Sequence, residues 1–161
     1  MRARAAFLMA LAIAWGVPVD GIRVGISHDS SELHVFVQND GETARNVVIG
    51  YDQWKSTQPN LKFIATTPDG REHEGFDPAS FQPLAGLVVP VVARIEPGAI
   101  RELRFPLRSL LCVEKPGDVT FDALVKQGAS VRVALQVDAM AAQWSGARDA
   151  WIGAAVSPEV F

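Results

Sequence analysis

Cysteine is nearly absent from this chain: of its 161 residues, only Cys112 carries a thiol. An internal disulfide bond is therefore impossible, and the fold must be stabilised by packing. Cys112 lies in the apolar run L-L-C-V, and free cysteine is among the most buried residue types. We expect Cys112 to be a small core residue, with a reactive or intermolecular thiol as the alternative.

Metal-ligand motifs are also absent. The three histidines never form H-E-x-x-H, because His73 has no second histidine four residues after it. His34 alternates with Leu33 and Val35, so we expect it to face solvent. No spacing specifies a site shared between histidines and acids, and we predict no metal ligand and no cofactor, with such a site as an open alternative. That alternative would draw on His28, His34, His73, Asp29, Asp52 and Asp77.

Catalytic signatures are missing too. The segment Q-W-S-G at 143–146 lacks the leading glycine of a G-x-S-x-G nucleophile elbow, and no glycine-rich strand-to-helix turn offers a phosphate site. Acidic residues number 18, so a carboxylate pair for glycoside hydrolysis can always be found, and spacing selects none. We therefore predict that the protein is not an enzyme and has no catalytic residue.

No apolar run is long enough for a membrane-spanning helix, which needs about 20 residues. The candidate at the front, Ala5–Val17, has 13 uncharged residues, follows Arg2 and Arg4, and ends at Pro18. A positive start followed by a short apolar segment is typical of an export signal. We predict a periplasmic or secreted protein without a stable membrane span after cleavage. The alternative is a buried amino-terminal helix in a cytosolic protein.

Small side chains mark the expected cleavage point. Signal peptidase prefers them one and three positions before the cut, and Gly16 and Ala14 meet this condition. The predicted signal peptide is residues 1–16, and the mature domain is residues 17–161. Residues 1–16 hold two arginines and no acid, so 13 basic and 18 acidic residues remain, a formal charge of 13 − 18 = −5.

Basic residues do not gather into a run anywhere in this acidic mature chain. Binding to a phosphate backbone depends on a concentrated positive surface, so we expect no nucleic-acid partner. About 145 residues form one ordinary domain with a core of its own. We expect this domain to be a monomer.

Apolar residues alternate with polar ones in several short segments, the pattern of strands with one buried face. Clear examples are 22–26, 33–37 and 131–137. Asn39-Asp40-Gly41 predicts a hairpin turn leading into the run 46–51, and Thr67-Pro68-Asp69-Gly70 predicts a second hairpin turn. Long helical periodicity is missing, with 139–148 open as a short helix or a loop. The sequence therefore predicts an all-β antiparallel sandwich of about seven to nine strands.

Proline interrupts the long apolar passage 81–95. The segment from Leu87 to Val92 is rich in β-branched residues, but Pro90 cannot donate a hydrogen bond to a neighbouring strand. We therefore expect an edge strand or an extended crossover at this point. An edge strand is also a place where a strand from a partner can add to the sheet.

Three turn and strand motifs occur together in the second half of the chain. They are I-E-P-G-A-I-R-E-L-R-F-P-L from Ile95, K-P-G-D-V-T-F from Lys115 and W-I-G-A-A-V-S-P-E-V from Trp151. This combination resembles immunoglobulin-like sandwiches of exported bacterial proteins, among them the non-catalytic amino-terminal region of deuterolysin-type metalloproteases and the proteinase-inhibitor-like sandwiches. The resemblance implies an immunoglobulin-like fold and an extracytoplasmic location, not proteolysis. The matching positions are Pro97, Gly98, Pro116, Gly117, Trp151, Gly153 and Ser157.

Aromatic side chains that stay exposed in a soluble domain are good candidates for binding. Tyr51 and Trp54 stand where a strand becomes the polar loop 52–60, and Trp144 lies in an Ala- and Ser-rich segment. A sugar ring or a side chain of a partner can stack on such residues. We predict Tyr51, Trp54 and Trp144 as binding residues. The alternative is burial at the ends of the sandwich, which we favour for Trp151.

Together these features predict a secreted or periplasmic accessory module that binds a protein partner or a cell-envelope component and has no catalytic centre. The end loops and edge strands of a sandwich carry binding sites, so 52–60 and 81–95 are the first places to look. Two alternatives stay open. One is a sandwich-type proteinase inhibitor that inserts an exposed loop into a protease, and the other is a small metal-dependent hydrolase.

Overall fold

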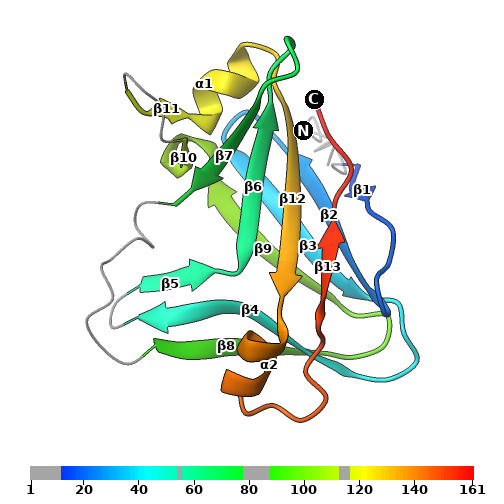
Figure 1. The fold of residues 1–161 in the computed structure, drawn as a ribbon. Helices are drawn as coiled ribbons and strands as arrows, with labels where there is room; N and C mark the ends of the chain where they lie inside the picture. The colour runs from blue at the N-terminus through cyan, green and yellow to red at the C-terminus, as the bar shows by residue number, and fades with distance from the viewer. Residues whose placement is uncertain (1–11, 54–55, 78–87, 113–116) are drawn as a thin grey trace, which may run out of the picture.

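The protein folds into layered antiparallel sheets, and the predicted all-β sandwich-like architecture is confirmed (Figure 1). The structure, a computed structural model, describes residues 12–53, 56–77, 88–112 and 117–161. Parts of the predicted signal peptide, of the polar loop and of the apolar passage lie outside these residues, as does Pro116 of the second motif. These parts are 1–11, 54–55 and 81–87.

The first sheet has four strands in the order β1-β2-β3-β9, and each neighbouring pair is antiparallel. Their bounds are β1 Ala14–Trp15, β2 Ile22–His28, β3 Glu32–Asn39 and β9 Ile100–Pro106. β2 and β3 form a tight hairpin in which the Asp29 carboxylate accepts hydrogen bonds from the backbone N–H groups of Ser31 and Glu32. The short acidic side chain thus supplies the acceptor that the turn backbone lacks.

The second sheet has six strands in the order β11-β10-β7-β6-β12-β13. Their bounds are β11 Val119–Thr120, β10 Leu111–Cys112, β7 Glu72–Phe76, β6 Leu61–Thr66, β12 Ser130–Val137 and β13 Gly153–Val156. The predicted turn at 67–70 joins β6 to β7, so this hairpin is confirmed. Gly70 has a φ of 82°, which glycine adopts without strain, and the Thr67 N–H donates to the Arg71 carbonyl at 2.9 Å.

The third sheet has three strands in the order β5-β4-β8. Their bounds are β5 Ser56–Pro59, β4 Arg45–Gln53 and β8 Val88–Ile95. β8 lies at the edge and contains Pro90, so the edge strand predicted there is confirmed. At Asn60 the chain leaves this sheet for β6. There the Asn60 N–H donates to the Ile49 carbonyl at 2.9 Å, and the side-chain amide donates to the Val48 carbonyl at 3.2 Å.

Alternate residues of β2, β3 and β12 form the centre of the core. Every second side chain along these strands is buried, as the sequence alternation predicts. The set comprises Ile22, Val24, Ile26, Leu33, Val35, Val37, Val131, Val133, Leu135 and Val137. Because β2 contacts both β12 and β13, this core lies between the first and second sheets.

Two residues that the sequence predicted to be buried are confirmed as core residues. Trp151 is 1% exposed, and its indole N–H donates to the Val19 carbonyl at 3.0 Å, which satisfies the polar atom of the ring. Cys112 is also 1% exposed. Both side chains therefore contribute to packing.

The hairpin predicted at Asn39-Asp40-Gly41 is wrong. β3 and β4 lie in different sheets, so the chain crosses from the first sheet to the third after Asn39. Asn39 is fully buried, and its side-chain amide donates to the carbonyls of Thr43 and Ile95 at 2.8 and 2.9 Å. The Asn-Asp-Gly sequence here serves a crossover, which needs the same backbone-satisfying residues as a hairpin turn.

Short connecting strands explain why the described residues contain thirteen strands rather than the predicted seven to nine. β1, β10 and β11 have two residues each, and β5 has four. The α-helices of the described ranges are α1 Phe121–Lys126 and α2 Ala139–Trp144, the second within the segment that the sequence left open. No helix in the described part of the chain is long and apolar enough to cross a membrane.

β1 lies within the predicted signal peptide and packs closely on β2. The Trp15 ring covers Gly25, where a Cβ atom would approach the ring to 2.5 Å. The Arg23 guanidinium lies 4.5 Å from the centroid of the same ring, and the Gly16 N–H donates to the Val24 carbonyl at 2.8 Å. Cleavage after Gly16 stays a prediction, and it would remove this strand from the sheet.

We expect Gly25→Ala to destabilise a chain that retains residues 12–16 and to be nearly neutral in a chain that begins at Val17. In the longer chain the added methyl group overlaps the Trp15 ring, and overpacking of this kind costs about 1–3 kcal/mol of unfolding free energy. Urea unfolding of the four proteins measures both differences. Equal destabilisation at the two chain lengths would contradict the packing of β1 on Gly25.

Candidate functional site

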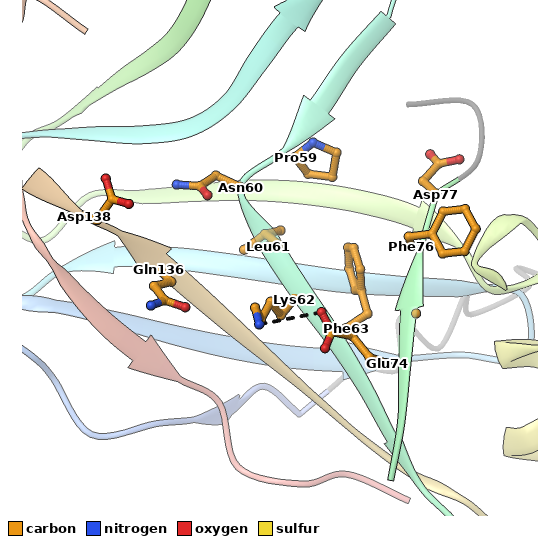
Figure 2. A pocket seen from close by; sticks show the side chains of 11 residues that line it. Pro59, Asn60, Leu61, Lys62, Phe63, Glu74, Phe76, Asp77, Gln136 and Asp138 are labelled. Atoms are coloured by element: carbon orange, nitrogen blue, oxygen red, sulfur yellow. Dashed lines mark ion pairs between the residues drawn. The ribbon is translucent and has the colours of Figure 1, made fainter. Parts of the chain in front are cut away.

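A groove lies at the end of the second sheet where β6 begins and where β7 and β12 end (Figure 2). Its volume is about 430 Å³, within the range of about 300–1,000 Å³ that is common for ligand sites. Polar side chains dominate its surface. The lining residues are Pro59, Asn60, Leu61, Lys62, Phe63, Glu74, Gly75, Phe76, Asp77, Gln136 and Asp138.

The charges along the groove are mostly negative. Lys62 supplies one ammonium group and Glu74, Asp77 and Asp138 supply three carboxylates, a formal charge of 1 − 3 = −2. Lys62 Nζ lies 3.6 Å from Glu74 Oε1, and both side chains are more than half exposed. Exposed ion pairs contribute little to stability, so these two side chains are free to exchange partners with a ligand. The net field of the groove attracts positive charge.

Tyr51, one of the predicted binding residues, is half-buried on β4 and does not line the groove. Burial raises the pKa of its hydroxyl above the ordinary value, and the negative charge of Asp138 raises it further. Tyr51 therefore stays protonated at neutral pH.

Trp144, another predicted binding residue, ends α2 and is 65% exposed. Met140 lies four residues earlier on the same helix face and is 55% exposed. We call Met140 and Trp144 the α2 patch. α2 starts at the groove, because Asp138 both lines the groove and caps the helix, its carboxylate accepting from the Ala141 N–H at 2.7 Å. The groove and the α2 patch are therefore neighbouring surfaces.

Trp54, the third predicted binding residue, lies outside the described residues. The groove was not found from the sequence, because its lining comes from three segments that only strand pairing brings together. The sequence carries only a weak signal of the groove, which is that the alternation in β6 and β7 places Lys62 and Glu74 at outward-facing positions. Met140 was also missed, although its spacing from Trp144 places the two on one face of any helix formed there.

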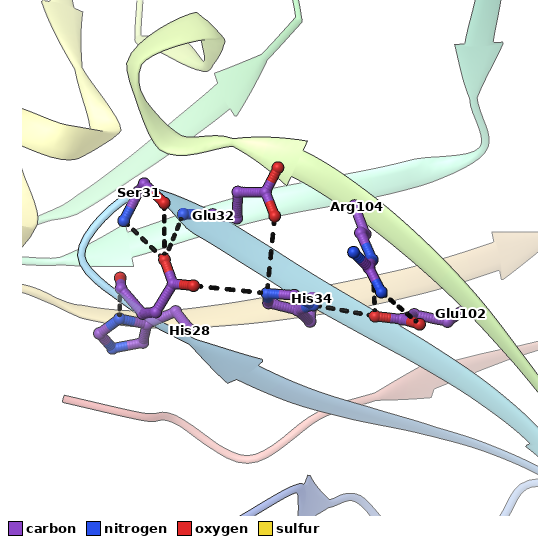
Figure 3. Close-up of polar contacts among 7 residues, drawn as sticks. His28, Ser31, Glu32, His34, Glu102 and Arg104 are labelled. Atoms are coloured by element: carbon purple, nitrogen blue, oxygen red, sulfur yellow. Dashed lines mark hydrogen bonds and ion pairs between the residues drawn. The ribbon is translucent and has the colours of Figure 1, made fainter. Parts of the chain in front are cut away.

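His34 is buried rather than solvent-facing, contrary to the prediction from alternation. It is 8% exposed, because carboxylates from β9 and from the β2–β3 turn surround the ring (Figure 3). Its Nδ1 atom lies 2.9 Å from Glu102 Oε1, and its Nε2 atom lies 3.8 Å from Asp29 Oδ2 and 3.9 Å from Glu32 Oε2. Alternation predicted the correct sheet face but not the longer side chains that cover it.

Hydrogen bonds favour the charged form of two carboxylates of this cluster, Asp29 and Glu102. The backbone N–H groups of Ser31 and Glu32, followed by the Ser31 hydroxyl, lower the pKa of Asp29 to about 2. Hydrogen bonds from Arg104 and then from His34 lower the pKa of Glu102. Among the described residues, no group of three or more His, Cys, Asp or Glu side chains is arranged to hold a metal ion.

Comparison with known proteins assigns no family to the chain. No family model matches it, and neither a curated protein nor a solved structure matches it. The resemblance to immunoglobulin-like sandwiches therefore stays a prediction, whereas the sandwich-like arrangement of antiparallel sheets is a property of the structure.

We expect Asp29→Ala to lower stability at pH 7 and the difference from the parent protein to shrink as the pH falls from about 4 to about 2. The pKa of Asp29 in the folded protein, about 2, lies below the ordinary value of about 3.9. Its stabilising contribution is therefore present above the ordinary pKa and is lost as the pH falls through the folded value. Guanidinium unfolding at several pH values measures this, with Asp118→Ala as the control at an exposed carboxylate. A difference that stays constant with pH would contradict the assignment.

Proposed function

We propose that this protein is a secreted or periplasmic binding module without a catalytic centre, and that it binds a basic, extended segment of a partner protein. The observation that carries this proposal is the acidic groove of the second sheet with the exposed α2 patch beside it. Protein interfaces commonly combine a buried aromatic anchor with complementary charge around it. The two surfaces supply these two components.

The charge of the groove favours a basic ligand. A lysine or arginine side chain of a partner meets three carboxylates there and a single ammonium group. Glu74 is exposed and, among the described residues, forms an ion pair with the exposed Lys62, so a ligand cation replaces that contact at little cost. An acidic peptide or a nucleic-acid phosphate meets an unfavourable field at the same place.

The α2 patch supplies the apolar part of the contact. Tryptophan is enriched among the residues that dominate binding energy, and Trp144 has 65% of its surface available for burial. Met140 adds a flexible side chain that adapts to the shape of a partner. Because Asp138 lines the groove and caps α2, which begins at Ala139, a segment bound in the groove can extend toward the patch.

The extracytoplasmic location is supported by the export-signal pattern of residues 1–16. A partner in that location is another exported protein or a protein component of the cell envelope. The packed core, which needs no disulfide, is compatible with folding after export.

We expect lysine- and arginine-rich peptides to bind the purified protein and acidic peptides of the same length not to bind, as measured by isothermal titration calorimetry. Glu74→Lys and Trp144→Ala should each weaken the binding of basic peptides at least about tenfold. The matched controls are Glu42→Lys, which makes the same charge change on an exposed connection, and Phe161→Ala, which removes an exposed aromatic ring at the carboxyl end.

Two results would count against this proposal. Equal binding of basic and acidic peptides would remove the charge argument for the groove. Equal losses in the control variants and in the variants of the groove and α2 patch would place the contact elsewhere on the molecule.

Metal analysis separates this proposal from the metal-dependent hydrolase alternative. We expect less than one zinc or copper ion per chain after dialysis, because the described histidines and carboxylates form no ligand set. Inductively coupled plasma mass spectrometry of the purified protein measures the content. One tightly held ion per chain would instead favour the hydrolase.

A further inference from the structure

β9 is the outermost strand of the first sheet. β3 pairs with it on one side, and within the described residues no strand pairs with it on the other. Most of its side chains are exposed, and Ile100 keeps 50% of its surface in contact with solvent. An unpaired edge of seven residues is a template on which another strand can form.

The unpaired backbone groups of β9 belong to its even-numbered residues. At one end of the β3–β9 pairing the Leu107 N–H donates to the Ser31 carbonyl at 2.9 Å, and at the other the Asn39 N–H donates to the Ala99 carbonyl at 3.2 Å. Successive residues of a strand direct these groups to opposite sides, so the odd-numbered residues face β3. The residues whose N–H and carbonyl groups point away from β3 are therefore Ile100, Glu102 and Arg104.

We propose that two copies of this chain pair through β9 in antiparallel orientation, about a two-fold axis at Leu103. Glu102 of each copy then lies directly opposite Arg104 of the other copy. Both residues have outward-pointing backbone groups, so each such pair exchanges two backbone hydrogen bonds. Their side chains project from the same sheet face, where opposite charges at opposed positions stabilise the pairing.

The charges of Glu102 and Arg104 favour the axis at Leu103 over an axis shifted by one residue in either direction. An axis at Glu102 places that carboxylate opposite the same carboxylate of the second copy, and an axis at Arg104 does the same with two guanidinium groups. Like charges at directly opposed positions destabilise an antiparallel pair. The axis at Leu103 instead gives two Glu–Arg pairs and brings two leucine side chains together on the inner face.

β9 also has features that commonly guard a sheet edge. It carries exposed charges, and Pro106 has no N–H to donate. These features discourage most incoming strands, because a foreign strand must offer the opposite charges in the matching order. A second copy of β9 offers that order. The sequence of charges and the direction of the backbone groups together favour the second copy as the occupant of this edge.

The expected association is weak. Stable complexes bury about 1,200–2,000 Å² in total, and a single pair of seven-residue strands buries less than that. Dilute protein is then monomeric, as the sequence predicts, and the dimer forms as the concentration rises. The groove and the α2 patch lie outside the first sheet, so this inference does not depend on the proposed function.

Sedimentation velocity of the full chain from about 10 μM to about 1 mM tests the pairing, and we expect a reversible monomer–dimer equilibrium. Arg104→Glu places a carboxylate opposite Glu102 in both halves and should weaken the dimer at least about tenfold. Glu102→Arg should have the same effect. An equimolar mixture of the two variants should dimerise again, because each chain then presents one sign of charge to the other.

The matched control lies at the end of β8. There the exposed Arg94 pairs at 2.8 Å with Glu96, the residue after the strand, as Arg104 pairs at 2.9 Å with Glu102 of its own chain. Arg94→Glu should leave the dimer unchanged. Glu102 also contacts His34, so thermal unfolding of each variant checks the fold, and Arg104→Glu decides alone if Glu102→Arg does not fold. A parent chain that stays monomeric at about 1 mM, a dimer that resists Arg104→Glu, or a mixture of folded variants that fails to dimerise overturns the proposal.

Discussion

The burial of alternate apolar side chains on β2, β3 and β12 is the constraint on which the rest of this structure depends. Each fully buried valine or leucine contributes about 1.5–3 kcal/mol relative to exposure. A slip of one residue in the pairing of β12 would turn its four buried apolar side chains to solvent and cost about 6–12 kcal/mol. That is comparable with the whole stability of a typical domain, about 5–15 kcal/mol. The burial of these side chains is therefore enough to fix the register of β12, and no disulfide bond is needed.

Polar side chains at the ends of the strands satisfy backbone groups that the apolar core cannot. Asn39 is fully buried, and its amide satisfies two carbonyls where the chain leaves the first sheet. The Asp29 carboxylate satisfies two backbone N–H groups where β2 turns into β3. A buried polar group without a partner costs about 1–3 kcal/mol, so the buried Asn39 amide helps to fix the crossover. The hydrogen bonds of Asp29 lie at an exposed turn and order its backbone there. The apolar pattern alone leaves the positions of the turn and the crossover undetermined.

The sequence predicted the features that depend on neighbours along the chain. Alternation predicted the buried faces, the Thr67–Gly70 turn predicted a hairpin, and Pro90 predicted an edge strand. The sequence did not correctly predict the features that depend on which strands lie next to each other. The crossover after Asn39 has the composition of a hairpin turn, and the burial of His34 depends on β9, which lies far from it in sequence. The groove likewise combines residues of β6, β7 and β12, and no local pattern encodes that combination.

The alternation that buries one set of side chains also leaves a second set for function. Lys62, Glu74 and Gln136 are the outward-facing counterparts of core residues on paired strands, and pairing places them around one groove. In the described part of the chain, the outer edge of β9 stays unpaired for a similar reason, because β3 bonds only with the backbone groups of the odd-numbered residues of β9. The β9 edge belongs to the first sheet and the groove to the second, so the proposed pairing through β9 uses no residue that lines the groove. Under the two proposals together, a partner with repeated basic segments would contact both grooves of a dimer, and the second contact, being intramolecular, would raise the overall affinity.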